Sequence, residues 1–124
     1  MSEDRARPRV LVVEDELMVA MGLELVLADA GYEVVGPLGR LDDALAAARV
    51  EEVDFALLDV NLRGAEVYPV ADVLSGRGIP FTFLTGYGRE ALPARHAGGS
   101  ILSKPFEASK LRATVAASVL AHPH

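Results

Sequence analysis

Five short, largely apolar segments that separate stretches of helical spacing are the feature that most constrains the fold. The alternation predicts strands and helices in turn along the chain. The predicted strands are Arg9–Val13, Tyr32–Val35, Asp54–Leu58, Phe81–Leu84 and Ile101–Ser103. Strands joined through helices pair in parallel by right-handed crossovers. We therefore expect an α/β fold, a doubly wound five-stranded parallel sheet with helices on both faces.

The segments between the strands predict helices of unequal quality. The predicted helices cover Glu16–Ala30, Asp42–Val50, about Tyr68–Ser75 and a last segment that Pro105 opens. Helical spacing in the first of them is carried by Leu17, Met21, Leu25 and Ala28. Gly31 lies just past its end and acts as a stop signal. Segment Gly86–Gly99 contains four glycines and a proline, so any helix there should be short or mobile.

Length, charge and composition narrow the class of protein. The 124 residues predict a single domain with a core of about residues 8–120 and no output domain. A net charge of −6 argues against nucleic acid as a partner, because phosphate backbones are held mainly by Lys and Arg. The absence of cysteine excludes disulfides and thiolate metal sites. Without a signal-peptide stretch or a membrane-spanning run, we expect a cytoplasmic protein.

Polar residues follow four of the five predicted strands. Glu14 and Asp15 follow the first strand and Asp59 follows the third. Thr85 follows the fourth strand and Lys104 follows the fifth. In open α/β sheets the ligand site lies beyond the carboxyl ends of the strands. These side chains should therefore meet at one edge of the sheet.

The residue types at this edge predict phosphoryl chemistry. Grouped carboxylates repel one another unless a cation neutralises them. With no His or Cys beside them, Mg²⁺ is the preferred ion. Asp59 could attack phosphorus as a nucleophile, and Lys104 and Thr85 could pair with the remaining phosphoryl oxygens. Neither a Walker sequence nor a GxGxxG motif follows the first strand, so nucleotide binding has no support.

Each residue also has a purely structural interpretation. An Asp after a strand commonly forms a turn, and Glu14–Asp15 could cap the following helix. Thr85–Gly86 could be a turn, and Lys104 could be a solvated lysine at a helix start. Their joint placement at one sheet edge favours the functional interpretation.

Four segments resemble the receiver domain of two-component response regulators. The matching segments are Val12–Glu16, Leu57–Leu62, Leu84–Gly86 and Lys104–Phe106. They span nearly the whole chain in the order and at the spacing of that family. The resemblance implies a flavodoxin-like sheet with strand order 2-1-3-4-5.

The same resemblance implies roles for these residues. Asp59 would be the phospho-acceptor, and Thr85 and Lys104 would contact the phosphoryl group. The implied magnesium ligands are Asp15, Asp59 and the backbone carbonyl of Asn61, with Glu14 assisting. The donor would be a phosphohistidine on a sensor histidine kinase or a histidine phosphotransfer protein. The chain would signal to an unknown downstream protein, would catalyse only its own phosphorylation and dephosphorylation, and is expected to be a monomer or weak dimer.

A narrower resemblance concerns segment Pro80–Gly88. It is similar to the Phe-Ala-Thr-Gly-Tyr signature of the FAT GUY receivers, with Leu84 where that signature has Ala. Members of this subgroup are typically single-domain proteins of alphaproteobacteria that are linked to stress signalling.

One position departs from the family pattern. Many receivers carry an aromatic switch residue three positions before the lysine, and this chain has Ile101 there. Our hypothesis is that Gly86–Gly99 carries the response instead, by a change of order. The switch candidates are Thr85, Gly86 and Tyr87.

Three alternatives remain open on the sequence. A haloacid-dehalogenase-like phosphatase also combines an Asp nucleophile, Mg²⁺, a Thr and a Lys. That chemistry normally uses a second Asp two positions on, where this chain has Asn61, and a nucleophile on the first strand. A pseudo-receiver would keep the fold as a binding module without taking phosphate. The chain could also be a piece of a longer hybrid kinase or regulator.

Overall fold

A parallel sheet lies at the centre of the computed structural model, which describes residues 7–88 and 91–121. Its five strands have the order β2-β1-β3-β6-β7. They are β1 (Arg9–Val13), β2 (Glu33–Leu38), β3 (Phe55–Asp59), β6 (Phe81–Thr85) and β7 (Ser100–Ser103). This confirms the predicted doubly wound sheet, because the order is 2-1-3-4-5 once the separate hairpin of β4 (Asn61–Leu62) and β5 (Ala65–Glu66) is set aside.

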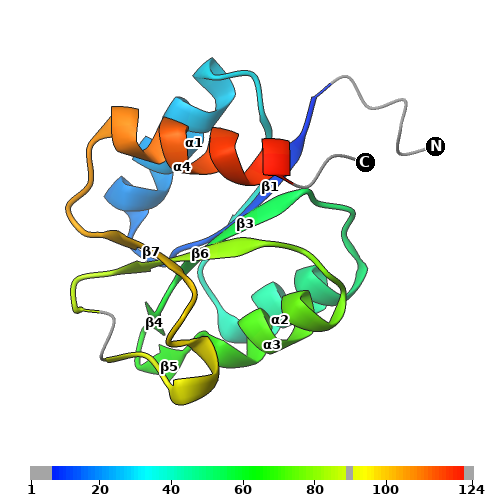
Figure 1. The fold of residues 1–124 in the computed structure, drawn as a ribbon, viewed down its shortest axis with the longest axis vertical. Helices are drawn as coiled ribbons and strands as arrows, with labels where there is room; N and C mark the ends of the chain where they lie inside the picture. The colour runs from blue at the N-terminus through cyan, green and yellow to red at the C-terminus, as the bar shows by residue number, and fades with distance from the viewer. Residues whose placement is uncertain (1–6, 89–90, 122–124) are drawn as a thin grey trace.

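Helices cover both faces of the sheet (Figure 1). Helices α1 (Leu17–Asp29) and α4 (Ala108–Ala121) pack together on one face. Helices α2 (Leu41–Val50) and α3 (Tyr68–Gly76) pack together on the other. Pro69 lies in the first turn of α3, where its missing N–H leaves no helical hydrogen bond unmade.

The central strand β3 links the two apolar cores. Phe55 and Leu57 point into the core beneath α1 and α4, whereas Ala56 and Leu58 point into the core beneath α2 and α3. Each large apolar side chain buried in this way contributes roughly 1.5–3 kcal/mol relative to an exposed one. Every residue of β3 is buried, so the backbone that leads to Asp59 is held on both sides.

Helix α1 forms where it was predicted, but its core face differs from the predicted spacing pattern. The side chains that pack on the sheet are those of Ala20, Leu23 and Leu27. By contrast, the predicted core residues Leu17 and Leu25 are 70% and 69% exposed. The helix is apolar on both faces, so the spacing of apolar residues alone does not select the buried one.

Strand β2 continues past its predicted end at Gly36–Pro37. Leu38 pairs with Val13 after a register shift in β1, and its carbonyl accepts a hydrogen bond from Glu14 N at 2.9 Å. Gly36 has φ of 103°, and a Cβ there would lie 2.7 Å from the carbonyl oxygen of Val12. The glycine therefore permits close strand approach instead of ending the strand.

The last helix begins at Ala108 and not at Pro105 as predicted. Its first turn is closed by a hydrogen bond from Leu111 N to the carbonyl of Glu107. The residues before it form a loop in which Phe106 packs against the core beneath α1 and α4. The proline therefore belongs to the loop that joins β7 to the helix.

Two short features follow β3 and β6. The antiparallel hairpin β4 (Asn61–Leu62) and β5 (Ala65–Glu66) was not predicted. Between β6 and β7 lies the short 3-10 helix η3 (Ala94–His96), which agrees, within the described residues, with the expectation of a short helix in Gly86–Gly99. Residues 89 and 90 of that segment lie outside the described part.

Candidate functional site

The carboxyl ends of β1, β3, β6 and β7 bring the predicted site residues to one edge of the sheet. These four strands are consecutive neighbours. Asp59 pairs in register with Leu84, and Lys104 N donates a 2.8 Å hydrogen bond to the carbonyl of Thr85. The order of the strands, and not proximity in sequence, thus assembles the site.

Three carboxylates converge at this edge. One oxygen from each of Glu14, Asp15 and Asp59 lies within 4.8 Å of the others. Glu14 is 2% exposed and Asp59 is also buried, while Asp15 is partly open to solvent. Like charges held this close in a buried setting destabilise one another unless cations compensate them.

Lys104 supplies one compensating cation. Its Nζ lies 2.9 Å from Glu14 Oε1 and 3.4 Å from Asp59 Oδ2. Burial lowers the pKa of the Lys104 ammonium, but the close contact with Glu14 and the negative charges of Asp59 and Glu14 outweigh burial and raise it. The lysine is therefore charged at neutral pH and bridges two carboxylates.

The acceptor candidate Asp59 has a strongly perturbed acidity. Burial, followed by the hydrogen bond and the charge of Glu14, raises the pKa of Asp59 from 3.8 to about 7. The charge of Lys104 and the backbone N–H of Asn61, which donates to Asp59 Oδ1 at 3.3 Å, act in the opposite direction. Lys104 thus offsets only part of the free-energy cost of ionising Asp59. A further cation at the site would lower the pKa of Asp59.

The donor set fits Mg²⁺. All three converging side chains offer carboxylate oxygens, the ligands that this hard cation prefers. Glu14 Oε1 is buried and lies 2.9 Å from the Lys104 ammonium, but among the described residues it accepts no hydrogen bond of good geometry. One lysine shared between two buried carboxylates, with a third carboxylate beside them, leaves negative charge that a divalent cation would stabilise.

Thr85 ends strand β6 beside Asp59, and its hydroxyl is tied to the next loop. Thr85 Oγ1 accepts a 2.9 Å hydrogen bond from the backbone N–H of Tyr87. Thr85 is buried, whereas the side chain of Tyr87 is 75% exposed. The space beside Gly86 is open. The hydroxyl oxygen of Thr85 therefore connects the site to Tyr87, another of the predicted switch candidates.

Sequence reasoning missed Arg63. It lies in the loop of the β4–β5 hairpin, and its Nε lies 3.7 Å from Asp15 Oδ2. Asn61 Oδ1 accepts a 2.8 Å hydrogen bond from Gly64 N across the same turn. Gly64 at the second loop position is compatible with a two-residue hairpin, but arginine at the first position is not a usual turn residue, and neither reveals which carboxylate the arginine meets.

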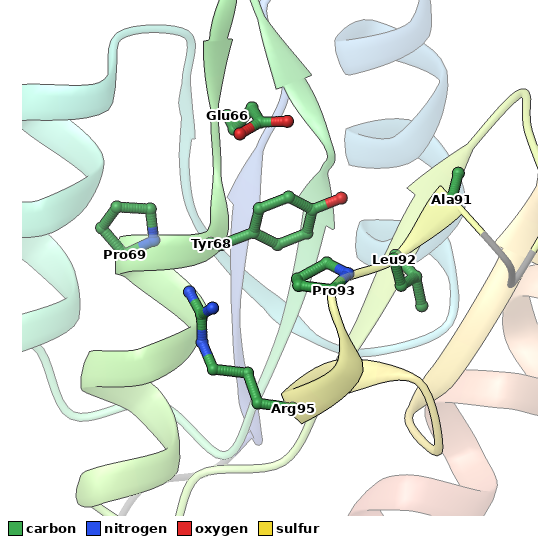
Figure 2. Close-up of a pocket in the computed structure, with 7 residues that line it drawn as sticks. All are labelled: Glu66, Tyr68, Pro69, Ala91, Leu92, Pro93 and Arg95. Carbon is green, nitrogen blue, oxygen red and sulfur yellow. The ribbon is translucent and has the colours of Figure 1, made fainter.

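A separate pocket of about 550 Å³ lies between the start of α3 and the segment that carries η3 (Figure 2). It is lined by Glu66, Tyr68, Pro69, Ala91, Leu92, Pro93 and Arg95. Figure 2 shows these side chains coming from two stretches of chain that face each other. None of the converging carboxylates lines it.

Helix η3 is fastened to α3 beside this pocket. Arg95 donates hydrogen bonds from Nε and Nη2 to the two oxygens of Asp72, each at 3.0 Å. His96 Nε2 lies 3.0 Å from Asp72 Oδ1, and its buried ring stacks on Tyr68 and meets Phe83 edge-on. We call Asp72, Arg95 and His96 the clasp. The clasp anchors the second half of Gly86–Gly99.

Within residues 7–88 and 91–121, each helix is too short or too polar to pass through a bilayer.

Comparison with known proteins places the fold and sequence among regulators. The chain is 35% identical over 113 residues to the transcriptional regulatory protein PdtaR of Mycobacterium tuberculosis, which is 87% of this chain and 55% of that protein. It is 38% identical to SdrG from Sphingomonas melonis, whose solution structure matches with a TM-score of 0.79 over 94% of this chain and 98% of that one. The BeF3-activated conformation of SdrG from Pseudomonas melonis matches at 37% identity with a TM-score of 0.75, over 94% and 99%.

These similarities concern one region of the curated relatives. The chain spans about half the length of those it matches. Residues 10–116 of this chain match the response regulator receiver domain. The matched region contains all five strands of the sheet, apart from Arg9 at the start of β1. The match, the strand order and the identity to PdtaR agree, and the chain belongs to the family of response regulator receiver domains.

Proposed function

We propose that this chain is a phosphoacceptor response regulator in which Asp59 receives a phosphoryl group from a phosphohistidine. The donor is a sensor histidine kinase or a histidine phosphotransfer protein in the cytoplasm. The observation that carries the proposal is the position of Lys104, whose ammonium contacts Asp59 and Glu14 at once. Family membership and the BeF3-activated form of SdrG support it, because BeF3 mimics a bound phosphoryl group.

The transfer requires little covalent chemistry from the protein. An Asp59 carboxylate oxygen attacks phosphorus, the P–N bond to the donor imidazole breaks, and the imidazole leaves with the bonding electrons. Catalysis is then mainly positioning and charge stabilisation. Lys104 pairs with one phosphoryl oxygen. The Thr85 hydroxyl donates a hydrogen bond to another phosphoryl oxygen. It is free to do so because Thr85 Oγ1 only accepts in its hydrogen bond with Tyr87 N.

We assign the magnesium site to Asp15, Asp59 and the backbone carbonyl of Asn61, with Glu14 assisting. When bound, Mg²⁺ would neutralise carboxylate and phosphoryl oxygens together. Lys104 alone leaves the pKa of Asp59 at about 7, so the metal-free site holds Asp59 only partly ionised at neutral pH. We therefore expect Mg²⁺ to raise the ionised fraction of Asp59 and with it the rate of phosphorylation.

The response is proposed to start at Thr85 and pass to Gly86 and Tyr87. A shift of the Thr85 hydroxyl toward a phosphoryl oxygen strains or breaks its bond with Tyr87 N. The clasp and the buried side chain of Leu92 hold the later part of the segment. We therefore place the change of order directly after Thr85, and the exposed Tyr87 ring presents it to a protein partner.

The alternatives are distinguished by this site. A haloacid-dehalogenase-like phosphatase finds no support, because the family match is to receivers and Asp59 ends the third strand of the chain. A pseudo-receiver differs from our proposal in one measurable property, which is whether Asp59 takes phosphate.

The decisive experiment is intact-protein mass spectrometry after treatment with acetyl phosphate and Mg²⁺. We expect one added phosphoryl group, lost in Asp59→Asn and in the presence of a chelator. The matched control is Asp54→Asn, because Asp54 is also a buried aspartate and directly precedes the same strand at its opposite end. The proposal would be overturned if Asp59→Asn were still phosphorylated. It would also be overturned if neither acetyl phosphate nor a phosphorylated histidine phosphotransfer protein modified the wild-type chain.

A further inference from the structure

The β4–β5 hairpin holds its tip in a defined place beside the site. Asn61 pairs with Glu66 and Leu62 pairs with Ala65, so Arg63 and Gly64 form a two-residue loop. Both loop residues have positive φ, 53° and 89°, as a type I′ turn requires. Arginine seldom adopts this backbone conformation. The chain nevertheless has an arginine here.

Several contacts fix the hairpin relative to Asp59. Leu62 is buried in the core beneath α2 and α3. Val67 N donates a 2.9 Å hydrogen bond to the carbonyl of Val60, which closes the base of the hairpin directly after Asp59. The side chain of Asn61 accepts a hydrogen bond from Gly64 N inside the loop. The position of the Arg63 Cα is therefore set by the same backbone that carries the acceptor.

Arg63 meets the one site carboxylate that Lys104 does not contact. Lys104 contacts Glu14 and Asp59, whereas Arg63 Nε lies 3.7 Å from Asp15 Oδ2. The side chain of Asp15 is 18% exposed and that of Arg63 is 74% exposed, so this pair lies at the solvent side of the site. Each of the three converging carboxylates thus has a cationic side chain as a neighbour.

From this arrangement we infer that Arg63 is a positioning residue that sets the Mg²⁺ affinity of the site by competing with the ion for Asp15. The inference rests on the proposed magnesium-dependent function. An ion that takes Asp15 must displace the guanidinium or tolerate its repulsion. The exposed, long arginine side chain leaves readily, so metal binding releases it from Asp15 and changes the charged surface at the hairpin tip.

The size of the effect follows from the exposure of the pair. Exposed ion pairs are worth little, but the competing ion carries two charges, so removing the Arg63 charge should tighten Mg²⁺ binding about threefold to tenfold at low ionic strength. The gain should shrink at higher salt, because ions screen a mostly exposed charge more than a buried one. A role of Arg63 in merely supporting the fold predicts neither the sign nor the salt dependence.

The test is isothermal titration of MgCl₂ into the full chain at about 50 mM and about 300 mM salt, conditions that change screening at this distance. Arg63→Gln removes the charge and should bind Mg²⁺ more tightly, whereas Arg63→Lys should stay near wild type. The matched control is Arg49→Gln, an exposed arginine in the last turn of α2, which should leave the affinity unchanged. Arg63→Gly, which suits a positive φ, should bind like Arg63→Gln and guards against a folding defect.

A second measurement follows the arginine itself. In ¹⁵N spectra the Nε–H resonance of Arg63 should move on Mg²⁺ addition and should already be moved in Asp15→Asn. Equal or weaker Mg²⁺ binding by both neutral variants overturns the inference and leaves the proposed function intact. A wild-type chain that binds no Mg²⁺ overturns the proposed metal site and this inference together.

Discussion

Thr85 Oγ1 accepts the backbone N–H of Tyr87 at 2.9 Å, so the residue that ends β6 also sets the start of the following loop. The hydroxyl retains its own proton for a further partner. Movement of this hydroxyl toward a phosphoryl oxygen would therefore also change its hydrogen bond with Tyr87 N, because both contacts share one oxygen atom. This relationship makes the proposed switch testable residue by residue.

Replacement of Thr85 by Ala should separate phosphorylation from the response. Asp59 and Lys104 remain, so we expect acetyl phosphate still to modify the protein, more slowly by roughly tenfold to a hundredfold for one lost hydrogen bond to a charged group. Amide shifts of Gly86 and Tyr87 on BeF3 addition should shrink, as measured by ¹H–¹⁵N spectra.

The control for that experiment is Thr82→Ala on the same strand, where the hydroxyl bonds to Ser100 at 2.8 Å away from the carboxylates. It should keep the full BeF3 response. Undiminished amide shifts in Thr85→Ala would show that another group transmits the signal.

Lys104→Gln should weaken both function and stability. Removal of the ammonium leaves the buried Glu14 and Asp59 carboxylates facing each other, so we expect a loss of about 1–3 kcal/mol in the free energy of unfolding. Urea denaturation at neutral pH in the presence of a chelator measures it. Mg²⁺ should restore part of the loss.

The control for this prediction is Lys110→Gln, on the exposed surface of α4, which should have little effect on the free energy of unfolding. Comparable losses in the Lys104 and Lys110 variants would contradict the bridging role of Lys104.

The stability of the metal-free protein should fall as pH rises through 7. Burial, then Glu14, raises the pKa of Asp59 to about 7, so the folded protein binds this proton more tightly than the unfolded chain does. The contribution to stability is complete below the unfolded pKa near 3.8 and is lost as pH passes the folded value. The expected loss between about pH 5 and about pH 8 is on the order of 2 kcal/mol.

Denaturant unfolding at several pH values in a chelator measures this loss. Asp59→Asn lacks the titrating group and should show a flatter profile over the same range. Mg²⁺ should flatten the wild-type profile, because the ion favours the ionised carboxylate. Identical profiles for the wild type and Asp59→Asn would mean that other groups account for the pH dependence.

The ring packing of His96 and the ion pair of Asp72 should contribute unequally to the free energy of unfolding. His96→Ala removes a buried ring that packs against Tyr68, Phe81 and Phe83, and it should cost about 1–3 kcal/mol in unfolding free energy. Asp72→Asn weakens the half-exposed pair with Arg95 and the contact with His96 Nε2, and it should cost less than His96→Ala because exposed ion pairs contribute little.

Thermal or urea unfolding of both clasp variants tests this order. Asp43→Asn, an exposed carboxylate 4.0 Å from Arg40, is the control and should be close to neutral. A larger loss from Asp72→Asn than from His96→Ala would show that the contacts of the Asp72 carboxylate, and not the ring packing, anchor η3.

The edge of the sheet that carries the site was predictable because four of the five apolar runs end in polar residues. Asp59, Thr85 and Lys104 each follow a short apolar run, and parallel topology then places them together. The face of α1 was not predictable, because Leu17 and Leu23 are equally apolar and only the geometry of the sheet selects Leu23 for burial. Gly36 was misread as a strand end because its close approach to the Val12 carbonyl is a tertiary relationship.

The hairpin and Arg63 mark the limit of sequence reasoning at the site. Each strand of the hairpin has two residues, too few for alternation to show. The pairing of Arg63 with Asp15 depends on how the hairpin sits over β1 and β3, which no local pattern encodes. Likewise, the link from Asp72 to His96 joins α3 to a segment whose glycines suggested only irregular structure.

The placement of Lys104 after an edge strand has a consequence for protein synthesis. A ribosome that has translated β1 through β6 has made every site carboxylate and Thr85, but no lysine to bridge Glu14 and Asp59. In such a nascent chain Glu14 and Asp59 lack the cation that bridges them in the finished fold. The lysine that pairs with a phosphoryl oxygen in the proposed function therefore becomes available only after β7 has been made.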